Sequence, residues 1–342
     1  MARISPAPLS KLTQFITPLA GQRSRDLAAA LAERTGATPR RARALLRELA
    51  ALGWLVNQGS PRRPCWRPGT LRQVVQHYAI AGLAEDRAWS RDFAPHFDSL
   101  PAAVQRMAQH AFTELVNNAV DHSDGSSVTV SMRQTATQMQ LLVSDDGRGL
   151  FDKLAAAFAL DDPLEAMFEL GKGKLTSAPD HHTGRGLYFS ARLADVFDLH
   201  ANASAFQRRG WEPGHWHAGH ALARRGTSIY LAIALDTERT LDAVMRAASL
   251  DGAGYTFERT LVPLGLLAGT SQVLESRAQA RRVAERLAQF AHVELDFGRV
   301  ADVGHGFADE LFRVLARRQP SLQWVPLNMA PRVAAMVASV GG

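Results

Sequence analysis

Hydrophobic residues recur every three or four positions along the first 52 residues, which is the spacing of helices with one buried face. The pattern predicts helices over about 9–18, 25–34 and 39–52. Ser24 and Thr38 are expected to cap the second and third helices. The buried stripe of the third helix is expected to be Leu45, Leu46, Leu49 and Leu52. Two short strands are expected next, around the Gly-Ser-Pro turn in WLVNQGSPRRPCWRP.

In the central part of the chain, the spacing of hydrophobic residues alternates between that of helices and that of strands. Residues 73–100 are mixed and are expected to form a helical connector, and Pro101 opens a helix that ends near His122. The alternating runs SSVTVSM and TQMQLLVS predict two strands joined by a short turn. Residues 151–182 read as helical and then loop-rich. TGRGLYFSARLADVF opens another helix, and VFDLHANASAF and GTSIYLAIAL predict further strands.

Beyond a polar linker at 236–254, the C-terminal part repeats a strand–helix unit three times. Strands are expected in FERTLVPL, HVELDFGRV and LQWVPLN, and helices in SRAQARRVAERLAQF, GFADELFRVLARR and APRVAAMVASV. Such alternation predicts a small sheet covered by helices. The predicted fold class is therefore α+β and multidomain. The expected divisions are an N-terminal domain at 1–72, a connector at 73–100, an α/β sandwich at 101–235 and a β-α-β-α-β-α domain at 255–342.

Charge is distributed unevenly along the 342 residues. Residues 1–72 hold 13 Lys and Arg against three acidic residues, whereas the rest of the chain holds 26 against 30. The basic end suits a polyanion. The single cysteine, Cys65, excludes an internal disulfide framework and favours a reducing cytoplasm. No signal peptide and no membrane span is expected, so we predict a cytoplasmic protein without a membrane partner.

Arginines cluster on the predicted third helix and at the tip of the strand pair. They are Arg40, Arg41, Arg43 and Arg47 on the helix, and Arg62 and Arg63 on the ribbon. Three helices followed by a two-stranded ribbon are typical of a winged helix-turn-helix, with the third helix in the DNA major groove. We therefore predict DNA as a partner. The alternative is a small basic domain that binds protein.

One face of the predicted helix ending at His122 gathers polar residues. They are Glu114, Asn117, Asn118, Asp121 and His122, spaced i, i+3, i+4, i+7 and i+8. Asparagine is a poor helix former, and residues 107–132 contain no Lys or Arg, which argues against an ordinary solvated face. An acidic, amide-rich face suits a hydrated Mg²⁺, and a glutamate one turn earlier can activate a water.

The motif SDDGRGL follows the second strand of the central domain. Asp145 stands at the strand end, where a carboxylate can accept a hydrogen bond from an exocyclic amine such as that of adenine. Gly147 and Gly149 let the backbone approach a flat ligand. An ordinary Asp-Gly turn is the alternative.

The motif HHTGRGLYF comes later and opens a helix. Free amide groups behind Gly184 and Gly186, together with the helix dipole, suit an anion. Thr227, in the Gly-Thr-Ser that starts the last strand of the domain, can offer a hydroxyl to a phosphate.

Taken in order, ELVNNAVDH, DDGRG, TGRGL and the closing Gly-Thr resemble the N, G1 and G2 boxes of the GHKL ATPases. This family includes gyrase, the heat-shock chaperone, histidine kinases and the mismatch-repair protein. The resemblance covers about 104–235 and implies an ATP-binding α/β sandwich with Mg²⁺ as the metal cofactor.

The resemblance also implies a role for each motif residue. Glu114 would be the general base and Asn118 the Mg²⁺ ligand. Asp145 would bind the adenine amine in a pocket shaped by Gly147 and Gly149. The remaining ATP-binding residues would be Gly184 and Gly186 at the phosphates, Thr227 near the adenine, and Lys172 and Lys174 in an ATP lid at 151–182. A solvated loop is the alternative for the two lysines.

Within this family, the sequences ELVNNAVDH and GRGLYFSARLAD are closer to those of the anti-sigma-factor serine kinases. The connector offers only His77 and His96 and no clear phosphoacceptor box, so histidine kinase activity is not expected. LDFGRVADVGHGFADELFRVL resembles a STAS-like domain, the kind of partner and substrate that those kinases use. Residues 302–306 stand where a phosphorylatable STAS protein has its serine, and they contain no hydroxyl. This domain is therefore expected to sense, dock or gate.

The sequence thus predicts an ATP-responsive transcriptional regulator with slow ATP hydrolysis. A winged helix would bind DNA, ATP would order the lid, and the STAS-like domain would contact a protein partner, with a homodimer as one form of assembly. One alternative is a serine/threonine protein kinase of the anti-sigma-factor type that acts on a partner protein. Another is an interaction protein with ATP as a structural ligand. The histidines of GHWHAGH (His215, His217 and His220) are expected in an exposed loop rather than at a metal.

Overall fold

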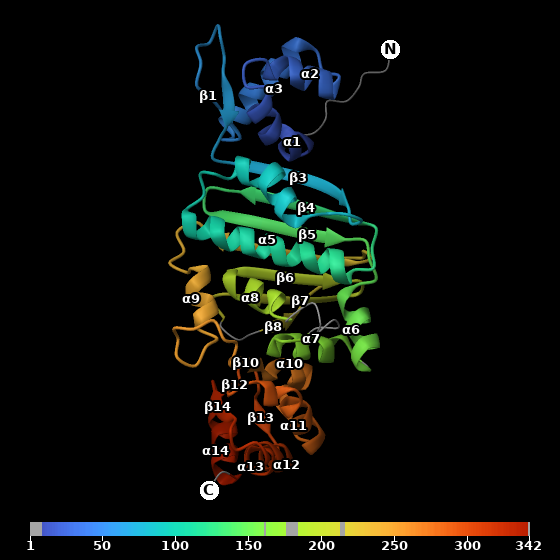
Figure 1. Ribbon diagram of the computed structural model, residues 1–342, viewed down its shortest axis with the longest axis vertical. Helices are drawn as coiled ribbons and strands as arrows, with labels where there is room; N and C mark the ends of the chain where they lie inside the picture. The colour runs from blue at the N-terminus through green and yellow to red at the C-terminus, as the bar shows by residue number, and fades with distance from the viewer. Residues whose placement is uncertain (1–8, 161, 176–183, 213–215, 341–342) are drawn as a thin grey trace. The chain divides into compact units, whose positions relative to one another are not determined.

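The computed structural model describes residues 9–160, 162–175, 184–212 and 216–340. Figure 1 shows the chain as a ribbon. Its contacts divide it into two compact units. The first contains Met1–Asp145 and Tyr230–Thr237, and the second contains Asp146–Ile229 and Glu238–Gly342. None of the helices in the described ranges combines the length and the apolar character that crossing a lipid bilayer requires.

The N-terminal part folds as three helices and a ribbon. These are α1 (Leu9–Gln22), α2 (Leu27–Thr35), α3 (Pro39–Ala51), and the antiparallel pair β1 (Leu55–Asn57) and β2 (Trp66–Pro68). Their core includes Leu12, Ile16, Leu31, Leu45, Leu49 and Trp54. The order of elements confirms the expectation for this segment. Their assignment as a DNA-binding winged helix stays a prediction.

One expected detail of these helices is confirmed and two are wrong. The Thr38 hydroxyl caps α3 by accepting from the amide of Arg41 at 3.3 Å, as expected. The second helix, however, begins after Asp26 and not after Ser24. Leu52 is 54% exposed rather than buried, because α3 ends at Ala51 and Leu52 is its C-cap.

The expected helical connector at 73–100 is wrong for its first part. Strand β3 (Arg72–Ala79) pairs antiparallel with β4 (Ser127–Gln134), and Val74 lies opposite Met132. Only Val74 of the eight strand residues is fully buried, so the alternating signal of a half-buried strand is weak here. Short helical segments follow: α4 (Glu85–Ala88), the π-helical η1 (Trp89–Phe93) and the 3₁₀-helical η2 (Ala94–His96).

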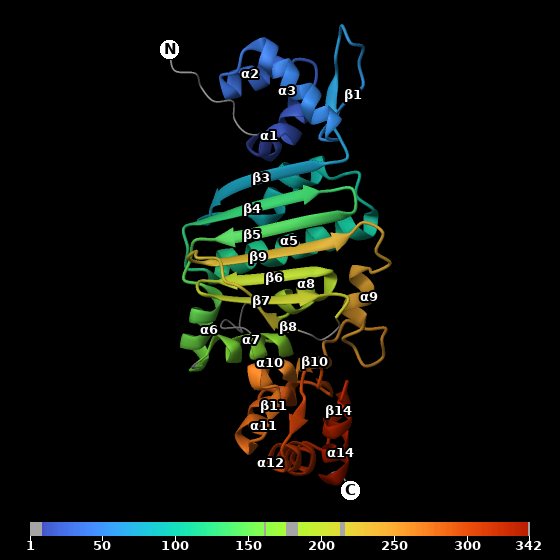
Figure 2. The ribbon, with the colours of Figure 1, turned by 180° about the vertical axis from the view of Figure 1, so that it is seen from behind.

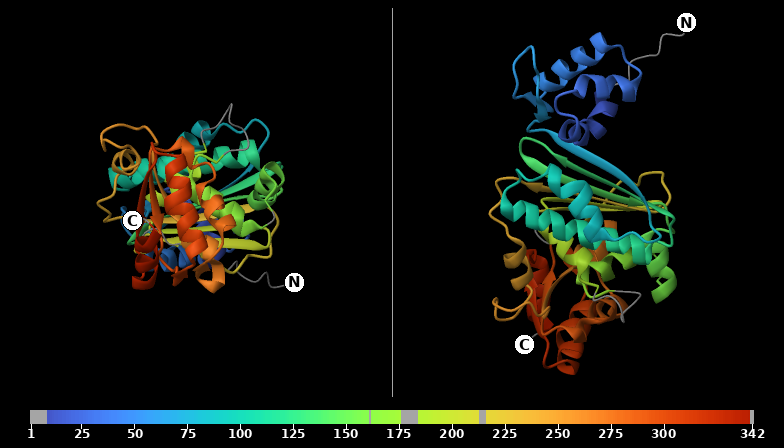
Figure 3. Two further views of the ribbon diagram at one scale, coloured as in Figure 1. Left: turned by 90° about the horizontal axis from the view of Figure 1, so that it is seen from below. Right: turned by 45° about the horizontal axis from the view of Figure 1, so that its top comes forward.

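Helix α5 (Ala102–His122) and the hairpin of β4 with β5 (Gln138–Asp145) confirm the helix and the two strands predicted here. The helix lies along one face of these strands, as the views in Figures 1 and 3 show. The centroid of the Phe112 ring, on this helix, lies 5.2 Å from that of Trp89 and 5.1 Å from that of Phe93. The segment after β3 therefore helps to fix α5.

The second unit holds the elements that follow the first glycine motif. They are α6 (Leu150–Phe158), α7 (Pro163–Lys172), α8 (Gly186–Leu193), β6 (Val196–Ala201), β7 (Ser204–Arg209), β8 (Trp216–Ala218) and α9 (Leu241–Arg246). With β9 (Thr227–Ala234), the large sheet has seven strands in the order β3-β4-β5-β9-β6-β7-β8 (Figure 2). A mixed α+β chain with a multi-stranded sheet agrees with the predicted α/β sandwich.

The C-terminal part has a three-stranded parallel sheet in the order β10-β12-β14. The strands are β10 (Arg259–Pro263), β12 (His292–Asp296) and β14 (Gln323–Leu327). The helical segments are α10 (Leu264–Ala268), η3 (Gly269–Ser271), α11 (Arg277–Ala284), η4 (Leu287–Gln289), α12 (His305–Ala308), η5 (Asp309–Leu315), α13 (Ala316–Arg318) and α14 (Pro331–Val340). The repeat of strand and helix confirms the prediction. A second parallel pair, β11 (Val273–Leu274) with β13 (Asp302–Val303), was not expected.

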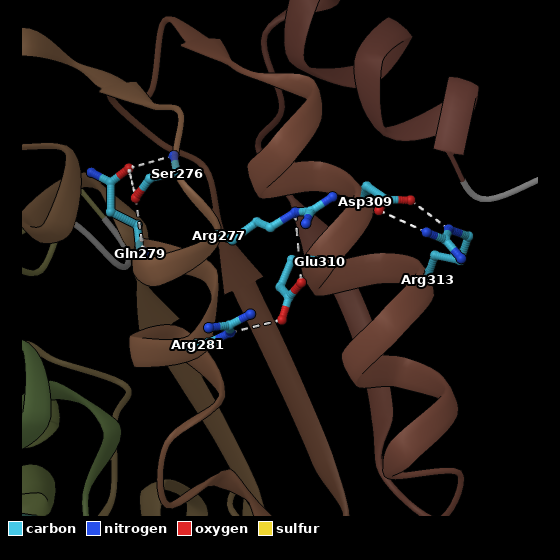
Figure 4. A network of polar contacts seen from close by, with 7 residues as sticks. All are labelled: Ser276, Arg277, Gln279, Arg281, Asp309, Glu310 and Arg313. Atoms are coloured by element: carbon cyan, nitrogen blue, oxygen red, sulfur yellow. Dashed lines mark hydrogen bonds and ion pairs between the residues drawn. The ribbon is translucent and has the colours of Figure 1, made fainter.

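Helices α11 and η5 are joined by ionic contacts (Figure 4). The buried carboxylate of Glu310 accepts from Arg281 Nε at 2.9 Å, and Arg277 Nε lies 4.0 Å from its other oxygen. Ser276 starts α11 with a reciprocal capping box to Gln279. These contacts fix α11 at its amino end and along one side, while its carboxyl end contacts α7.

Candidate functional site

Helix α5 presents the polar face that the sequence predicted. Phe112, Leu115, Val116 and Ala119 are buried, and Glu114, Asn117, Asn118 and His122 are half-buried, with Asp121 exposed. The i, i+4 spacing puts Glu114 and Asn118 one turn apart on the same side. The structure therefore keeps the predicted base and the predicted metal ligand on one accessible helix face. Their roles stay predictions.

Asp145 is the last residue of β5 and is 6% exposed. It lies opposite Val128 in the β4–β5 ladder, so its backbone is held by a regular antiparallel pair. A carboxylate at such depth needs polar partners, which suits a group that must accept a hydrogen bond from a buried ligand. The residues that precede it, Val143 and Ser144, are also buried.

The residues of the SDDGRGL motif that follow Asp145 lie on the loop after β5, in the second unit. Gly149 has φ +94° and ψ 134°, a conformation that a residue with a side chain rarely adopts. A Cβ at this position would also collide with the side chain of Asn202. Both facts explain why glycine stands at the start of α6.

Asn202 was missed by the sequence analysis, and it holds this loop. It sits in the turn between β6 and β7 with φ +50°, and its Nδ2 donates to the carbonyl of Arg148 at 2.8 Å and to Asp152 Oδ2 at 2.7 Å. Its Oδ1 accepts from the amide of Gly226 at 3.0 Å. One side chain thus joins the DDGRG loop to the Gly-Thr pair. The sequence signal was an ordinary turn asparagine, which does not reveal its partners.

Thr227 meets the same loop directly. Its hydroxyl accepts from the amide of Leu150 at 3.0 Å, 77 positions away in the chain. Arg225, also missed, donates from Nε to the carbonyl of Gly147 at 3.3 Å. The structure therefore brings Gly147, Gly149 and Thr227 together around Asn202.

Gly184 and Gly186 flank the start of α8. Gly184 has φ +63°, and a Cβ there would lie 2.5 Å from the carbonyl oxygen of Leu175. Gly186 is the first helical residue, and the residue before it, Arg185, makes no side-chain capping bond. The first-turn amides of α8 are therefore not capped by the side chain of Arg185. An anion site at a helix start requires amides that no side chain caps.

The carboxyl end of α8 is held by arginines. Arg208 Nη1 donates to the carbonyl of Ala191 at 2.8 Å, and Arg239 Nη1 donates to that of Leu193 at 2.7 Å. Arg239 also pairs with Asp195 at 2.7 Å. Cations at this end complement the helix dipole. Burial, with the nearby charges of Arg192 and Arg239, lowers the pKa of Arg208 to about 10, so it stays protonated at neutral pH.

The two lysines of the predicted lid contact the C-terminal part of the chain. Lys172 is 1% exposed, and its ammonium donates to Glu169 Oε1 at 2.7 Å and to the carbonyls of Arg282 and Glu285 at 2.8 and 3.2 Å. Lys174 Nζ donates to the carbonyl of Gln289 at 2.6 Å. Neither lysine is in the solvated loop that was the alternative. Their predicted contact with phosphate stays a prediction and requires these bonds to break.

The remaining polar motif of the sequence is GHWHAGH. His217 Nε2 lies 2.8 Å from Glu212 Oε2 and belongs to the short strand β8. His215 lies outside the described residues, as do residues 176–182 of the predicted lid. Among the residues that the structure describes, no group of three or more His, Cys, Asp or Glu side chains is placed to hold a metal ion.

Comparison with known proteins adds two domain matches. Residues 69–205 match the histidine kinase-like ATPase domain, which includes β3, α5, both glycine motifs and Asn202. Residues 279–327 match a STAS-like domain of unknown function. The first match begins before β3, so this strand is part of the matched ATPase domain rather than of a connector.

One curated relative is the sensor protein BceS of Bacillus subtilis (strain 168). It is 32% identical over 96 residues, which is 27% of this chain and 25% of that protein. The chain thus spans about a quarter of the length of this relative. A domain of the histidine kinase-like ATPase type implies ATP binding, usually with Mg²⁺. The chain therefore contains a histidine kinase-like (GHKL) ATPase domain and a STAS-like domain.

Proposed function

We propose that this protein is an ATP-binding regulator in which the nucleotide state of the GHKL domain controls contacts of the flanking domains. The observation that carries the proposal is the bonded loop around Asn202. Gly149 in its positive-φ conformation, Thr227 and Gly226 are held together by side-chain to main-chain bonds. Such a pre-formed loop lets main-chain groups approach a ligand without reorganisation.

The residues of the chain fit Mg-ATP by their chemistry. Asp145 would accept a hydrogen bond from the adenine amine, and the amides at Gly184 and Gly186 would face the phosphates. Asn118 offers an amide oxygen, a hard ligand that Mg²⁺ accepts beside its waters. Glu114 would take a proton from the attacking water. When bound, ATP supplies the phosphoanhydride bond whose cleavage resets the switch.

The direct test is equilibrium binding of ATP and of a non-hydrolysable analogue, with and without Mg²⁺. Asp145→Asn keeps the shape of the side chain but removes the charge that favours the adenine amine, so affinity should fall by about tenfold or more. Wild-type protein that binds neither nucleotide, or a variant with wild-type affinity, would contradict the proposal.

DNA binding by the N-terminal part is a second proposal, and it rests on the exposure of its arginines. Arg40, Arg43 and Arg47 are all exposed on α3, and Arg62 and Arg63 are exposed between β1 and β2. Arg41 pairs instead with Glu48 at 3.1 Å, which lowers its value as a phosphate ligand. Duplex binding measured with and without ATP tests whether the nucleotide state reaches this surface.

Protein kinase activity is the competing proposal for the same ATP site. The STAS-like domain points to protein interactions, and kinases of the anti-sigma-factor type act on STAS proteins, as the resemblance of the motifs implies. Labelled γ-phosphate that appears on a protein would favour the kinase. Label released as inorganic phosphate would favour the switch, and no turnover at all would favour ATP as a structural ligand.

A further inference from the structure

Helix α7 and the turn after it are packed against the STAS-like part within the second unit. The Lys172 ammonium has three N–H groups, and its three acceptors are Glu169 Oε1 and the carbonyls of Arg282 and Glu285. These two carbonyls belong to the last turn of α11 and its C-cap, which favour a cation. The main-chain carbonyl of Lys172 accepts from the Thr260 hydroxyl at 2.6 Å, so the same residue is held from both sides.

Aromatic residues complete this contact. Phe257 lies between Tyr188 and Phe189 of α8 and Phe290 of the C-terminal part, with centroid distances of 4.6, 5.3 and 5.2 Å. Lys174 Nζ lies 4.3 Å from the centre of the Phe290 ring. Burial lowers the pKa of Lys174, as it does that of Lys172. Lys172 is therefore buried in this contact, and Lys174 is half-buried in it.

Charge and backbone shape match across the contact as well. Arg282 Nη1 lies 2.5 Å from Glu165 Oε1, and Arg286 Nε lies 3.9 Å from Glu169 Oε2. A Cβ on Gly173, which has φ +77°, would lie 2.7 Å from the Phe257 ring, and a Cβ on Gly171 would lie 3.1 Å from Pro263. The two glycines of GKGK thus permit the close approach that the two lysines then secure.

We propose that the STAS-like domain is an internal inhibitor of nucleotide binding, which holds Lys172 and Lys174 away from the phosphates. The inference rests on the proposed ATP site, and it gives that site its regulator. An ammonium whose three protons are all donated to protein acceptors has none left for a phosphate. Docking of the domain and ligation of phosphate by Lys172 are therefore mutually exclusive, and each lowers the affinity of the other by the same factor.

The test weakens docking without touching either lysine. Glu165→Arg and Arg282→Glu each place like charges across the contact, whereas the double variant restores opposite charges in reversed order. The two single variants change the net charge in opposite directions. A gain in ATP affinity that both share therefore cannot come from long-range attraction of the nucleotide. Arg332→Glu is the matched control, because Arg332 pairs with Asp302 at 3.2 Å, outside the set of contacts described for α7.

Two readouts are needed on the full-length protein. Hydrogen exchange of 163–175 and 277–290 without nucleotide reports docking. Titration with a non-hydrolysable ATP analogue reports affinity. Both single variants should exchange faster in these segments and bind the analogue about fivefold tighter or more. The double variant and Arg332→Glu should resemble the wild type in both readouts.

The outcomes separate the inhibitor from the ATP site itself. Unchanged exchange in the single variants overturns the docking contact, and faster exchange with unchanged or weaker affinity overturns the inhibition. Wild-type and variant proteins that all fail to bind the analogue overturn the proposed function, and the inhibition with it. In that case the exchange measurement still decides whether the docking contact exists.

Discussion

Asn202 donates from Nδ2 to the main-chain carbonyl of Arg148 at 2.8 Å, so a turn between two strands fixes the loop that follows a third. This loop carries Gly147 and Gly149, and the same amide group reaches Gly226 on its other side. Asn202 therefore positions the residues that are predicted to touch ATP, although no motif includes it.

Asn202→Ala should weaken ATP binding by about tenfold or more, since it removes three side-chain hydrogen bonds worth roughly 1 kcal/mol each. Asn328→Ala is the matched control. Asn328 also has a positive φ, of +54°, and bonds Asp296 at 2.8 Å in the C-terminal part. Titration calorimetry should show normal affinity in the control and a loss in Asn202→Ala. Equal losses would assign Asn202 a general structural role.

Glu114→Ala should bind ATP normally and lose turnover, because the helix face stays intact while the proposed base is removed. The ATPase rate is expected to fall by about 100-fold or more. Asn117→Ala, on the same face, is the control for disturbance of α5. A Glu114 variant that hydrolyses ATP at the wild-type rate would exclude the glutamate as the base.

Gly184→Ala should cost more stability than Gly36→Ala. Both glycines have a similar positive φ, +63° and +68°, so alanine meets a strain of about 1–2 kcal/mol at each. A Cβ at Gly36 has no atom within 4 Å, whereas at Gly184 it would press on the backbone of Leu175. Urea denaturation should therefore give the larger loss for Gly184→Ala. Equal losses would show that the contact with Leu175 relaxes freely.

Neutralising Arg40, Arg43 and Arg47 together should weaken binding to duplex DNA and make it less dependent on salt. Each lost phosphate contact lowers the slope of log K against log salt by about 0.9. Lys11→Ala, an exposed cation of α1, should leave the slope unchanged. Wild-type protein that shows no binding at low salt would contradict the DNA-binding proposal.

The stability of the first unit should fall as the pH drops below about 6.5, the ordinary histidine pKa. Burial lowers the pKa of His110, which lies one turn before Glu114 on α5. A depressed folded pKa means that the unfolded chain binds the proton more readily, so acid favours unfolding until the folded pKa is reached. Burial also lowers the pKa of His96 in the same unit. Denaturation between pH 5 and 7.5 should therefore show this slope in wild type and in His305→Gln, an exposed control, a smaller slope in His110→Gln, and the smallest slope when His96→Gln is added.

The elements that the sequence predicted well are those with a strong period. Helix α5 begins after Pro101 and buries the expected stripe, since its apolar residues recur at helical spacing over 21 residues. Strand β3 was missed because only Val74 is fully buried in it, so its alternation is nearly invisible. Its place in the sheet comes from pairing with β4, about 55 positions later, which no local pattern encodes.

The candidate site shows the same division. The motif glycines were found because positive φ or close approach demands glycine, as at Gly149 and Gly184. Asn202 was not found because its partners are 50 or more positions away on one side and 24 on the other. Lys172 is expected at the phosphates because it lies in the segment that the resemblance identifies as the ATP lid, yet its bonds are to carbonyls 110 and 113 residues further on.

Helix α8 has eight residues and is about 12 Å long, which makes it a stiff rod. Its amino end adjoins Gly184, its side packs on Phe257 through Tyr188 and Phe189, and its carboxyl end is fastened by Arg208 and Arg239. A helix held in this way moves as one rigid body. A ligand that displaced Phe257 would therefore tilt the whole helix and move the glycine motif at its amino end, without a change in the helix itself.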